Sequence, residues 1–181
     1  MRKFAIVLVD TEITVTESKT LAAGTRLAET RSQIVIRGAG GFGGQTPPRE
    51  PKVAEIPKDR PADFRIEERT QAEQALLYRL SGDRNPLHAD PDFAKSVGFD
   101  TGPILHGLCT FGYMVRHAAQ GAAGGDASRL TVFETTFRKP VWPGDTLLTE
   151  GWELPDGKIA LQVRVPERDE TVCTASWATK A

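Results

Sequence analysis

The chain has 181 residues, a formal net charge of −1 at pH 7 and 39% hydrophobic residues. This length suits one domain, or one domain with part of a second, and the apolar fraction can fill a sizeable core. Without blocks of like charge, neither nucleic acid nor a membrane surface is expected as the main partner. The two cysteines, Cys109 and Cys173, have neither metal-ligand spacing nor the pattern of a disulfide framework, which favours a reducing compartment.

The N-terminal sequence MRKFAIVLVDTEITV predicts a strand rather than a signal peptide. Its apolar run is short, Asp10 and Glu12 interrupt it, and no small-residue cleavage site follows. No run in the chain approaches the ~18 apolar residues of a membrane helix. We therefore expect a cytoplasmic protein without a membrane segment.

Residues 3–10 and 25–37 are rich in β-branched and alternating apolar residues, which predicts two strands. The following GAGGFGG, at 38–44, and QTPPREPK predict a loop or linker, and we expect a boundary there. Backbone N–H groups of the glycines could cradle a phosphate, or the segment could be a flexible connector. It matches neither a Walker A nor a dinucleotide-binding pattern.

A strand is expected in ADFRIEERT, because its apolar and charged residues alternate. Thr70 followed by Glu73 has the spacing of a capping box. Apolar residues at helical spacing then predict a helix that ends near Gly82.

Two further helices are expected. Asp90 followed by Pro91 is typical of an N-cap with proline at the first helical position, and this short helix should end at Gly98. A longer, partly buried helix should begin near His106 and run through GLCTFGYMVRHAAQG. Cys109 should lie in the core, and His117 should interact with the C-terminal end of this helix.

From about residue 129 the hydrophobic period changes to two. LTVFETTFRKPVW, TLLTEGWEL, KIALQVRVPE and ETVCTASWA predict four strands, separated by turn sequences at 143–145, 155–157 and 167–169. Strands that follow helices in this way predict an α+β fold, with an antiparallel sheet wrapped against a central helix.

The stretch YRLSGDRNPLHADPDFAKSVGFDTGPILHGLCTFG, residues 78–112, holds the candidate site. Asp83 and His88 are five residues apart, ~140° around a helix, so they cannot share a helix face. Pro86 moves Asn85 out of the helical region, which predicts a loop in which both side chains can converge. An aspartate and a histidine on one water form an acid–base pair, and Asn85 could orient that water. The structural alternative is an ordinary Asp-Asn-Pro turn.

His106 and Gly107 open the long helix. Backbone N–H groups at a helix start are unpaired and lie at the positive end of the helix dipole. Gly107 has no side chain to block their approach, so this position can stabilise an oxyanion. The alternative is a structural histidine beside a glycine selected for packing.

The quoted stretch closely resembles the signature of the type 2 enoyl-CoA hydratases, the MaoC-like group of hot-dog proteins. The similarity extends through FRKPVWPGDTL to the end of the chain. The resemblance implies a hot-dog fold and reversible hydration of trans-2-enoyl-CoA to (3R)-3-hydroxyacyl-CoA in fatty acid metabolism. Acyl-CoA is then the substrate, and no metal or redox cofactor is implied.

The same resemblance implies site residues. Asp83 and His88 would be the catalytic pair, Asn85 would support them, and the Gly107 N–H would bind the thioester carbonyl. The resemblance also places four residues where family members line the substrate site: Arg84, Pro86, Leu87 and Phe137. From their charge alone, we expect Arg138 or Lys139 to meet the CoA phosphates.

Residues 1–44 resemble the last strands of the first hot-dog domain in two-domain members of the family. The rest of that first domain has no counterpart in this sequence. We expect 45–61 to be a linker and 62–181 to be the catalytic domain. A homodimer or a partner subunit would then complete the acyl pocket. The alternatives are a dehydratase acting on carrier-bound 3-hydroxyacyl chains, a CoA-binding remnant with little turnover, and a hot-dog thioesterase.

Overall fold

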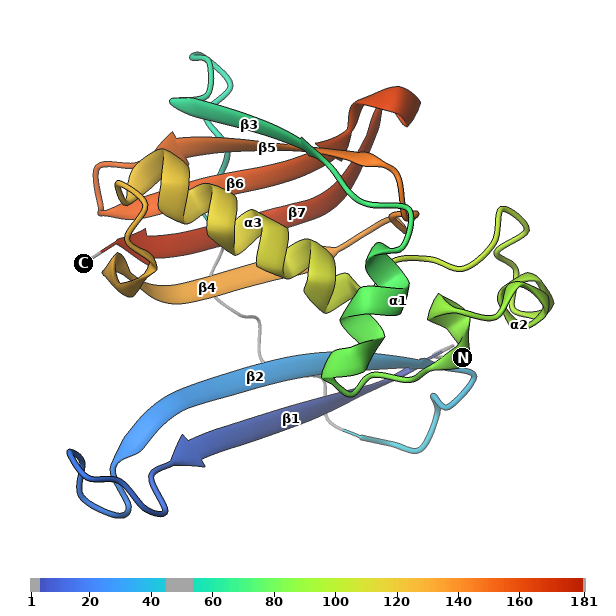
Figure 1. The fold of residues 1–181 in the computed structure, drawn as a ribbon, viewed down its shortest axis with the longest axis horizontal. Coiled ribbons are helices and arrows are strands. Elements are labelled where there is room, and N and C mark those ends of the chain that lie inside the picture. The colour runs from blue at the N-terminus through green and yellow to red at the C-terminus, as the bar shows by residue number, and fades with distance from the viewer. Residues whose placement is uncertain (1–3, 45–53, 181) are drawn as a thin grey trace. The chain divides into compact units, whose positions relative to one another are not determined.

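The computed structural model describes residues 4–44 and 54–180 (Figure 1). The chain divides into two compact units, Met1–Pro51 and Lys52–Ala181. The expected linker 45–61 falls partly outside the described residues, at 45–53. Its later part already contacts the sheet of the second unit, where Arg60 donates to the Glu153 carbonyl at 2.7 Å. Ordered contacts therefore begin before residue 62.

The described part of the first unit is an antiparallel hairpin, β1 (Phe4–Thr14) and β2 (Arg26–Arg37). Both strands lie close to their expected positions. Their register places Asp10 opposite Arg31, and the Arg31 guanidinium donates to both Asp10 carboxylate oxygens at 2.6 and 3.1 Å. Three consecutive β2 residues, Ile34, Val35 and Ile36, are all exposed. Because successive side chains of a strand point to opposite faces, both faces of the hairpin carry exposed apolar surface.

The second unit contains one antiparallel sheet of five strands. Its spatial order is β3 (Phe64–Arg69), β5 (Thr146–Glu153), β6 (Lys158–Val165), β7 (Glu170–Lys180) and β4 (Leu130–Phe137). These strands and the turns between them confirm the expected α+β pattern. β4 ends at Phe137 rather than at Trp142, since the chain then turns toward Pro140, which has no N–H to donate to a sheet.

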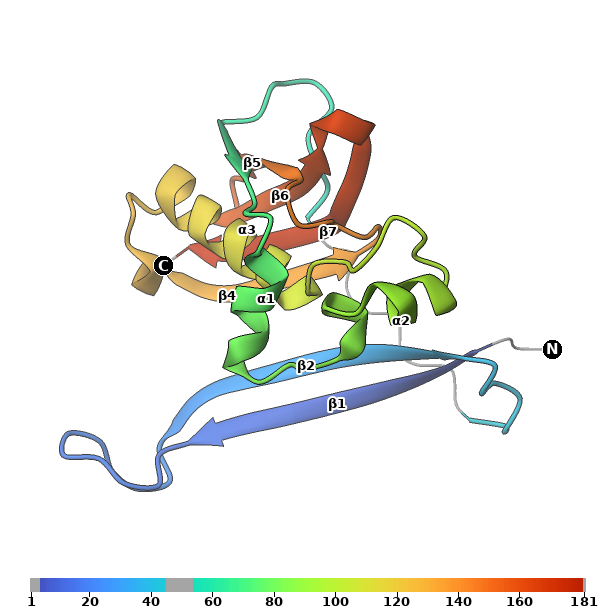
Figure 2. The ribbon, with the colours of Figure 1, turned by 45° about the vertical axis from the view of Figure 1, so that its right-hand side comes forward.

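The long helix α3 (Gly107–Ala122) lies across one face of this sheet (Figures 1 and 2). Its inner face buries Met114, Ala118 and Ala122 in the core. The Phe64 ring lies against Gly121 of α3 and Gly151 of β5, and a Cβ on either glycine would overlap that ring. The two glycines therefore allow the helix and the sheet to approach closely. This wrapped helix confirms the expected hot-dog architecture.

The first helical segment differs from the expected one. It consists of α1 (Gln74–Tyr78) followed by a 3₁₀ turn (Arg79–Ser81), and it ends at Gly82 as expected. The capping-box prediction is wrong, because Glu73 is the N-cap residue and makes no side-chain cap. The Thr70 hydroxyl instead donates to the Asp145 carbonyl at 3.0 Å and accepts the Gly144 N–H at 2.9 Å. The Thr70 hydroxyl therefore makes a long-range contact with a loop instead of capping the helix locally.

The other helices agree with the sequence. The short helix α2 (Pro91–Ser96) begins after Asp90, whose carboxylate accepts the Asp92 and Phe93 N–H groups. Cys109 is buried, as expected. The prediction for His117 is wrong: it lies well before the end of α3, fully buried between Thr149 and Glu68. Within residues 4–44 and 54–180, no helix has the length and apolar character needed to cross a bilayer.

Candidate active site

The loop after Gly82 is non-helical as far as Asn85, as the sequence predicts, but its last three residues, Pro86–His88, form a short 3₁₀ helix. Gly82 has φ 128°, in the left-handed half of backbone space that glycine tolerates, and it ends the 3₁₀ turn. Asn85 has φ −52° and ψ 125°, as expected before Pro86. The Asn85 N–H donates to Asp83 Oδ1 at 3.2 Å, and the Asn85 side chain accepts the Leu87 N–H at 3.1 Å. Two consecutive side-chain turns thus fix the path from Asp83 to His88.

His88 lies at the end of a second 3₁₀ turn (Pro86–His88) and is buried. Its Nδ1–H donates to the Ile104 carbonyl at 2.8 Å, because a carbonyl oxygen can only accept. The Ile104 N–H in turn donates to the Leu87 carbonyl at 3.3 Å. When the imidazole is neutral, this bond leaves the lone pair on Nε2, where a water proton can be accepted.

His106, the N-cap residue of α3, stacks on His88. The ring centroids are 3.7 Å apart and the ring planes differ by 26°. His106 Nε2–H donates to the Asp83 carbonyl at 3.2 Å, while its Nδ1 is buried and lacks a partner among the described residues. Burial lowers the pKa of His106, and the neighbouring His88 lowers it further. A neutral His106 therefore joins the Asp83 loop to the start of α3.

The sequence did not predict that His106 stacks on His88. Its only sequence signal was the His-Gly pair at the helix start, which directed attention to the Gly107 N–H. Tyr78 was also missed, although its ring contacts His106 with centroids 4.6 Å apart. These aromatic contacts join segments that are distant in the sequence, so local spacing could not reveal them.

Gly107 is the first residue of α3, where the N–H has no preceding turn of the helix to bond. An ideal Cβ at Gly107 would lie 3.5 Å from the Phe137 ring, which is ordinary van der Waals contact. Phe137 is 46% exposed at the end of β4. The structure thus brings the expected oxyanion donor and one expected substrate-lining residue together.

The remaining expected residues fall into two groups. In the His88 loop, Arg84 and Pro86 are exposed and Leu87 is half-buried. After β4, Arg138 donates to Thr174 Oγ1 at 2.7 Å, and Lys139 forms an ion pair with Glu170 at 3.6 Å. Both cations directly follow Phe137 in the chain, and their side chains contact residues of β7.

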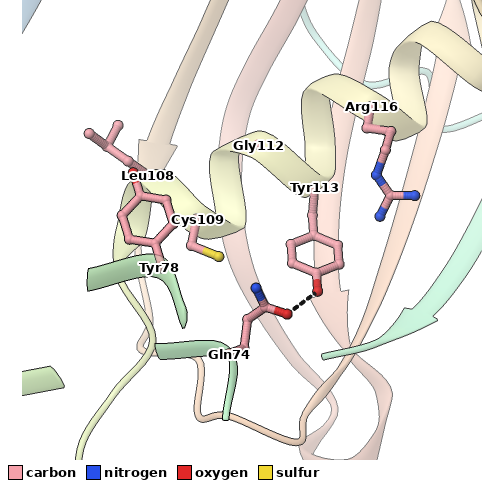
Figure 3. Close-up of a pocket in the computed structure, with 7 residues that line it drawn as sticks. All are labelled: Gln74, Tyr78, Leu108, Cys109, Gly112, Tyr113 and Arg116. Atoms are coloured by element: carbon pink, nitrogen blue, oxygen red, sulfur yellow. Dashed lines mark hydrogen bonds between the residues drawn. The ribbon is translucent and has the colours of Figure 1, made fainter. Parts of the chain in front are cut away.

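Two cavities are lined in part by residues of α1. One, of about 330 Å³, lies between α1 and α3 and includes Tyr78 in its lining (Figure 3). The other, of about 350 Å³, is lined by His88 itself together with Ala72, Leu76 and Trp142, among others. Volumes near the lower end of the usual ligand-pocket range suit small apolar groups.

Asp83, His88 and His106 each offer one ligand atom, and these atoms lie within 4.8 Å of one another. A metal ion prefers the plane of each imidazole that binds it. The two rings here are stacked with nearly parallel planes, so their in-plane lone pairs do not converge on one point. The geometry suits two proton acceptors on a small polar molecule better than a metal centre.

The chain matches the family described as MaoC like domain over residues 53–174. It is 46% identical over 147 residues to 3-hydroxyacyl-thioester dehydratase Y of Mycobacterium tuberculosis, covering 81% of this chain and 50% of that protein. It is 42% identical over 165 residues to the peroxisomal enoyl-CoA hydratase 2 of Arabidopsis thaliana, covering 87% and 52%. The chain thus spans about half the length of these relatives.

A solved structure gives the same result. The MaoC-like dehydratase of Phytophthora capsici is 36% identical, with a TM-score of 0.86 over 99% of this chain and 57% of that one. Sequence and structure therefore agree, and the chain belongs to the MaoC-like domain family.

Proposed function

We propose that this chain hydrates trans-2-enoyl-CoA reversibly to (3R)-3-hydroxyacyl-CoA, with Asp83 and His88 as the catalytic pair. One observation carries the proposal: the Asp83 carboxylate and the His88 imidazole lie within 4.8 Å of each other, beside the N-terminus of α3. Relatives named enoyl-CoA hydratase 2 and 3-hydroxyacyl-thioester dehydratase support this class of reaction.

In the proposed mechanism, a single water molecule donates two hydrogen bonds, one to the Asp83 carboxylate and one to His88 Nε2. Two acceptors occupy both hydrogens and leave an oxygen lone pair to attack C3 of the enoyl group. One acceptor takes a proton as the O–C3 bond forms and the C2–C3 π electrons shift toward the thioester carbonyl. C2 then receives that proton, which completes the addition of water.

Negative charge develops on the thioester oxygen during this step. The Gly107 N–H would stabilise it, because it is unpaired within the helix and lies at the positive end of the α3 dipole. One such donor is typically worth roughly 10²–10³-fold in rate. Asn85 would act as a positioning residue, since its side chain holds the Leu87 N–H in the turn that carries His88.

The CoA portion would leave the site past Phe137 and the adjacent cations. Arg138 and Lys139 would meet CoA phosphates, with Lys139 exchanging its half-buried Glu170 partner for a phosphate. Arg84, Pro86 and Leu87 would line the other side of the thioester. No metal or redox group takes part in this proposal.

Dehydration of carrier-bound 3-hydroxyacyl chains is the second candidate. The relative named 3-hydroxyacyl-thioester dehydratase favours it, because dehydration is the same reaction in the reverse direction. Comparing 3-hydroxyacyl-CoA with the corresponding acyl-carrier thioester as substrates distinguishes the two functions.

Assembly would complete the substrate site. A two-stranded hairpin is marginally stable alone, and both faces of β2 carry exposed apolar residues, which favours a homodimer or a partner subunit. Light scattering of the purified chain tests this directly. A monomer at all concentrations would refute self-assembly.

The catalytic test follows the loss of conjugated-enoyl absorbance with crotonyl-CoA. We expect Asp83→Asn and His88→Ala each to lower kcat roughly 10²–10⁴-fold, as removal of an acid–base group does. Asp90→Asn is the matched control, because Asp90 is a helix cap outside the site. A folded wild-type chain that binds CoA without turnover would indicate the remnant, and release of free thiol would indicate a thioesterase.

A further inference from the structure

The proton on His88 is placed differently from the protons on the other two histidines. His88 carries it on Nδ1, which donates to the Ile104 carbonyl at 2.8 Å. His106 and His117 carry theirs on Nε2, which donates to other acceptors. The tautomer of a neutral imidazole is set by the hydrogen bonds that its two nitrogens make. The position of the Ile104 carbonyl therefore decides whether His88 Nε2 keeps a free lone pair.

Ile104 lies in a short loop before α3, and a second loop holds this one from both sides. The Leu105 N–H donates to the Val141 carbonyl at 2.7 Å. The Trp142 indole Nε1–H donates to the Gly102 carbonyl at 3.2 Å. These two bonds fix the backbone before and after Ile104, and with it the direction in which the Ile104 carbonyl points.

The Trp142 side chain is itself held in place. Its backbone N–H donates to Asp145 Oδ2 at 2.6 Å, and the Arg168 guanidinium lies over its ring, 4.7 Å from the ring centroid. Arg168 also donates to Asp145 Oδ1 at 2.5 Å and to the Pro140 carbonyl at 3.1 Å. The indole N–H is therefore a fixed donor rather than the end of a mobile side chain.

The loop that carries Ile104 depends on this outside support. The Ile104 N–H donates to the Leu87 carbonyl at 3.3 Å, which is long for a backbone donor. Gly102 has φ 115°, and glycine loses more conformational freedom on folding than any other residue. The Trp142 indole supplies the contact that holds the Gly102 carbonyl, so its loss would loosen the backbone that leads to Ile104.

We propose that Trp142 is a positioning residue for the hydration reaction. Its indole N–H holds the Gly102 carbonyl, and the loop then presents the Ile104 carbonyl that keeps the His88 proton on Nδ1. This role rests on the proposed function, in which His88 Nε2 accepts a hydrogen bond from the attacking water. Trp142 acts through His88 and not on the reacting atoms, so its loss should change kcat rather than KM.

The kinetic test compares Trp142→Phe with Trp152→Phe in the full chain. Both changes remove an indole N–H that donates to a backbone carbonyl, since Trp152 Nε1–H donates to the Arg60 carbonyl at 3.4 Å. Trp152 lies in β5 and makes that bond away from the loop that carries Ile104. Trp142→Phe should lower kcat for crotonyl-CoA roughly 2-fold to 10-fold, the net value of one neutral hydrogen bond, and leave KM unchanged. Trp152→Phe should leave both constants unchanged.

Nitrogen-15 NMR of the chain with labelled histidine measures the tautomer, because protonated and unprotonated ring nitrogens differ in chemical shift. At a pH where the imidazoles are neutral, the wild type should show His88 as Nδ1–H, and His106 and His117 as Nε2–H. Trp142→Phe should shift His88 toward Nε2–H and leave His117 unchanged. Trp142→Tyr also lacks the indole N–H, and as a second variant it should give the same result.

The outcomes separate this role from the proposed function. A lower kcat in Trp142→Phe with an unchanged His88 tautomer would overturn the inference, and so would a kcat equal to that of Trp152→Phe. Absence of crotonyl-CoA turnover in the folded wild type would instead refute the proposed function. The tautomer measurement needs no turnover, and it then decides by itself whether Trp142 orients His88.

Discussion

Two buried histidines should make the chain less stable as the pH falls from 7.5 to 5.5. Burial lowers the pKa of both His106 and His117. His117 is fully buried, its Nε2–H donates to Glu68 Oε2 at 3.1 Å, and its Nδ1 accepts the Thr149 hydroxyl at 2.8 Å. Protonation of Nδ1 would remove the lone pair that accepts this hydroxyl and would place a charge in the core.

The sign and size follow from proton linkage. The unfolded chain binds a proton at an imidazole with a pKa of 6.5, whereas the folded chain resists it, so acid favours unfolding. An imidazole that stays neutral in the folded chain contributes a loss of about 1.4 kcal/mol between pH 7.5 and 5.5. Two such histidines give at most about 2.8 kcal/mol, which is a large share of an ordinary domain's stability.

The assay is urea unfolding at both pH values, followed by tryptophan fluorescence. His117→Gln removes one titrating group but keeps an amide that can donate to Glu68, so its stability loss between the two pH values should be smaller, by at most about 1.4 kcal/mol. Thr149→Val is the matched control. It removes the hydroxyl partner but leaves His117 to titrate, so it should lower stability at both pH values while keeping the pH-dependent loss.

An equal pH-dependent loss in His117→Gln and in the wild type would refute the reasoning. Measurements are made at pH 5.5 or above so that Glu68 stays ionised. The pKa of Glu68 lies below its ordinary value of 4.5, with hydrogen bonds from His117 and Arg116 among the causes, so this carboxylate keeps its charge throughout.

Two further changes test packing and the site loop. Gly121→Ala should destabilise the chain by about 1–3 kcal/mol, because the added Cβ would overlap the Phe64 ring. Gly112→Ala in the same helix is the control and should not destabilise the chain, because its Cβ would meet no atom within 4 Å. Thermal unfolding compares the two variants. Asn85→Ala and Asp90→Ala each remove a side-chain cap worth about 0.5–2 kcal/mol of stability. Only Asn85→Ala should also lower kcat for crotonyl-CoA. Equal losses of kcat in the two variants would contradict a positioning role for Asn85.

The sequence predicted most of the elements because their signals are local. Asp90-Pro91 marked the start of α2, the His-Gly pair marked the start of α3, and period-two alternation marked the late strands. The Thr70–Glu73 pattern was a local signal too, and it failed. Thr70 reaches Asp145 and Gly144 across the fold, and such a long-range contact overrides a cap that is worth only about 1 kcal/mol.

For the site, the sequence by itself determined a loop that interrupts the helix between Asp83 and His88, and a glycine at the start of the long helix. Gly82 tolerates the positive φ that ends the helix, and Pro86 restricts the backbone of Asn85, so both features of the loop follow from the local sequence. Only the tertiary structure decided that His106 stacks on His88, that Tyr78 contacts His106, and that the Trp142 indole binds the Gly102 carbonyl. Ring contacts and long-range hydrogen bonds depend on how distant segments pack, and packing is not encoded in the spacing of neighbouring residues.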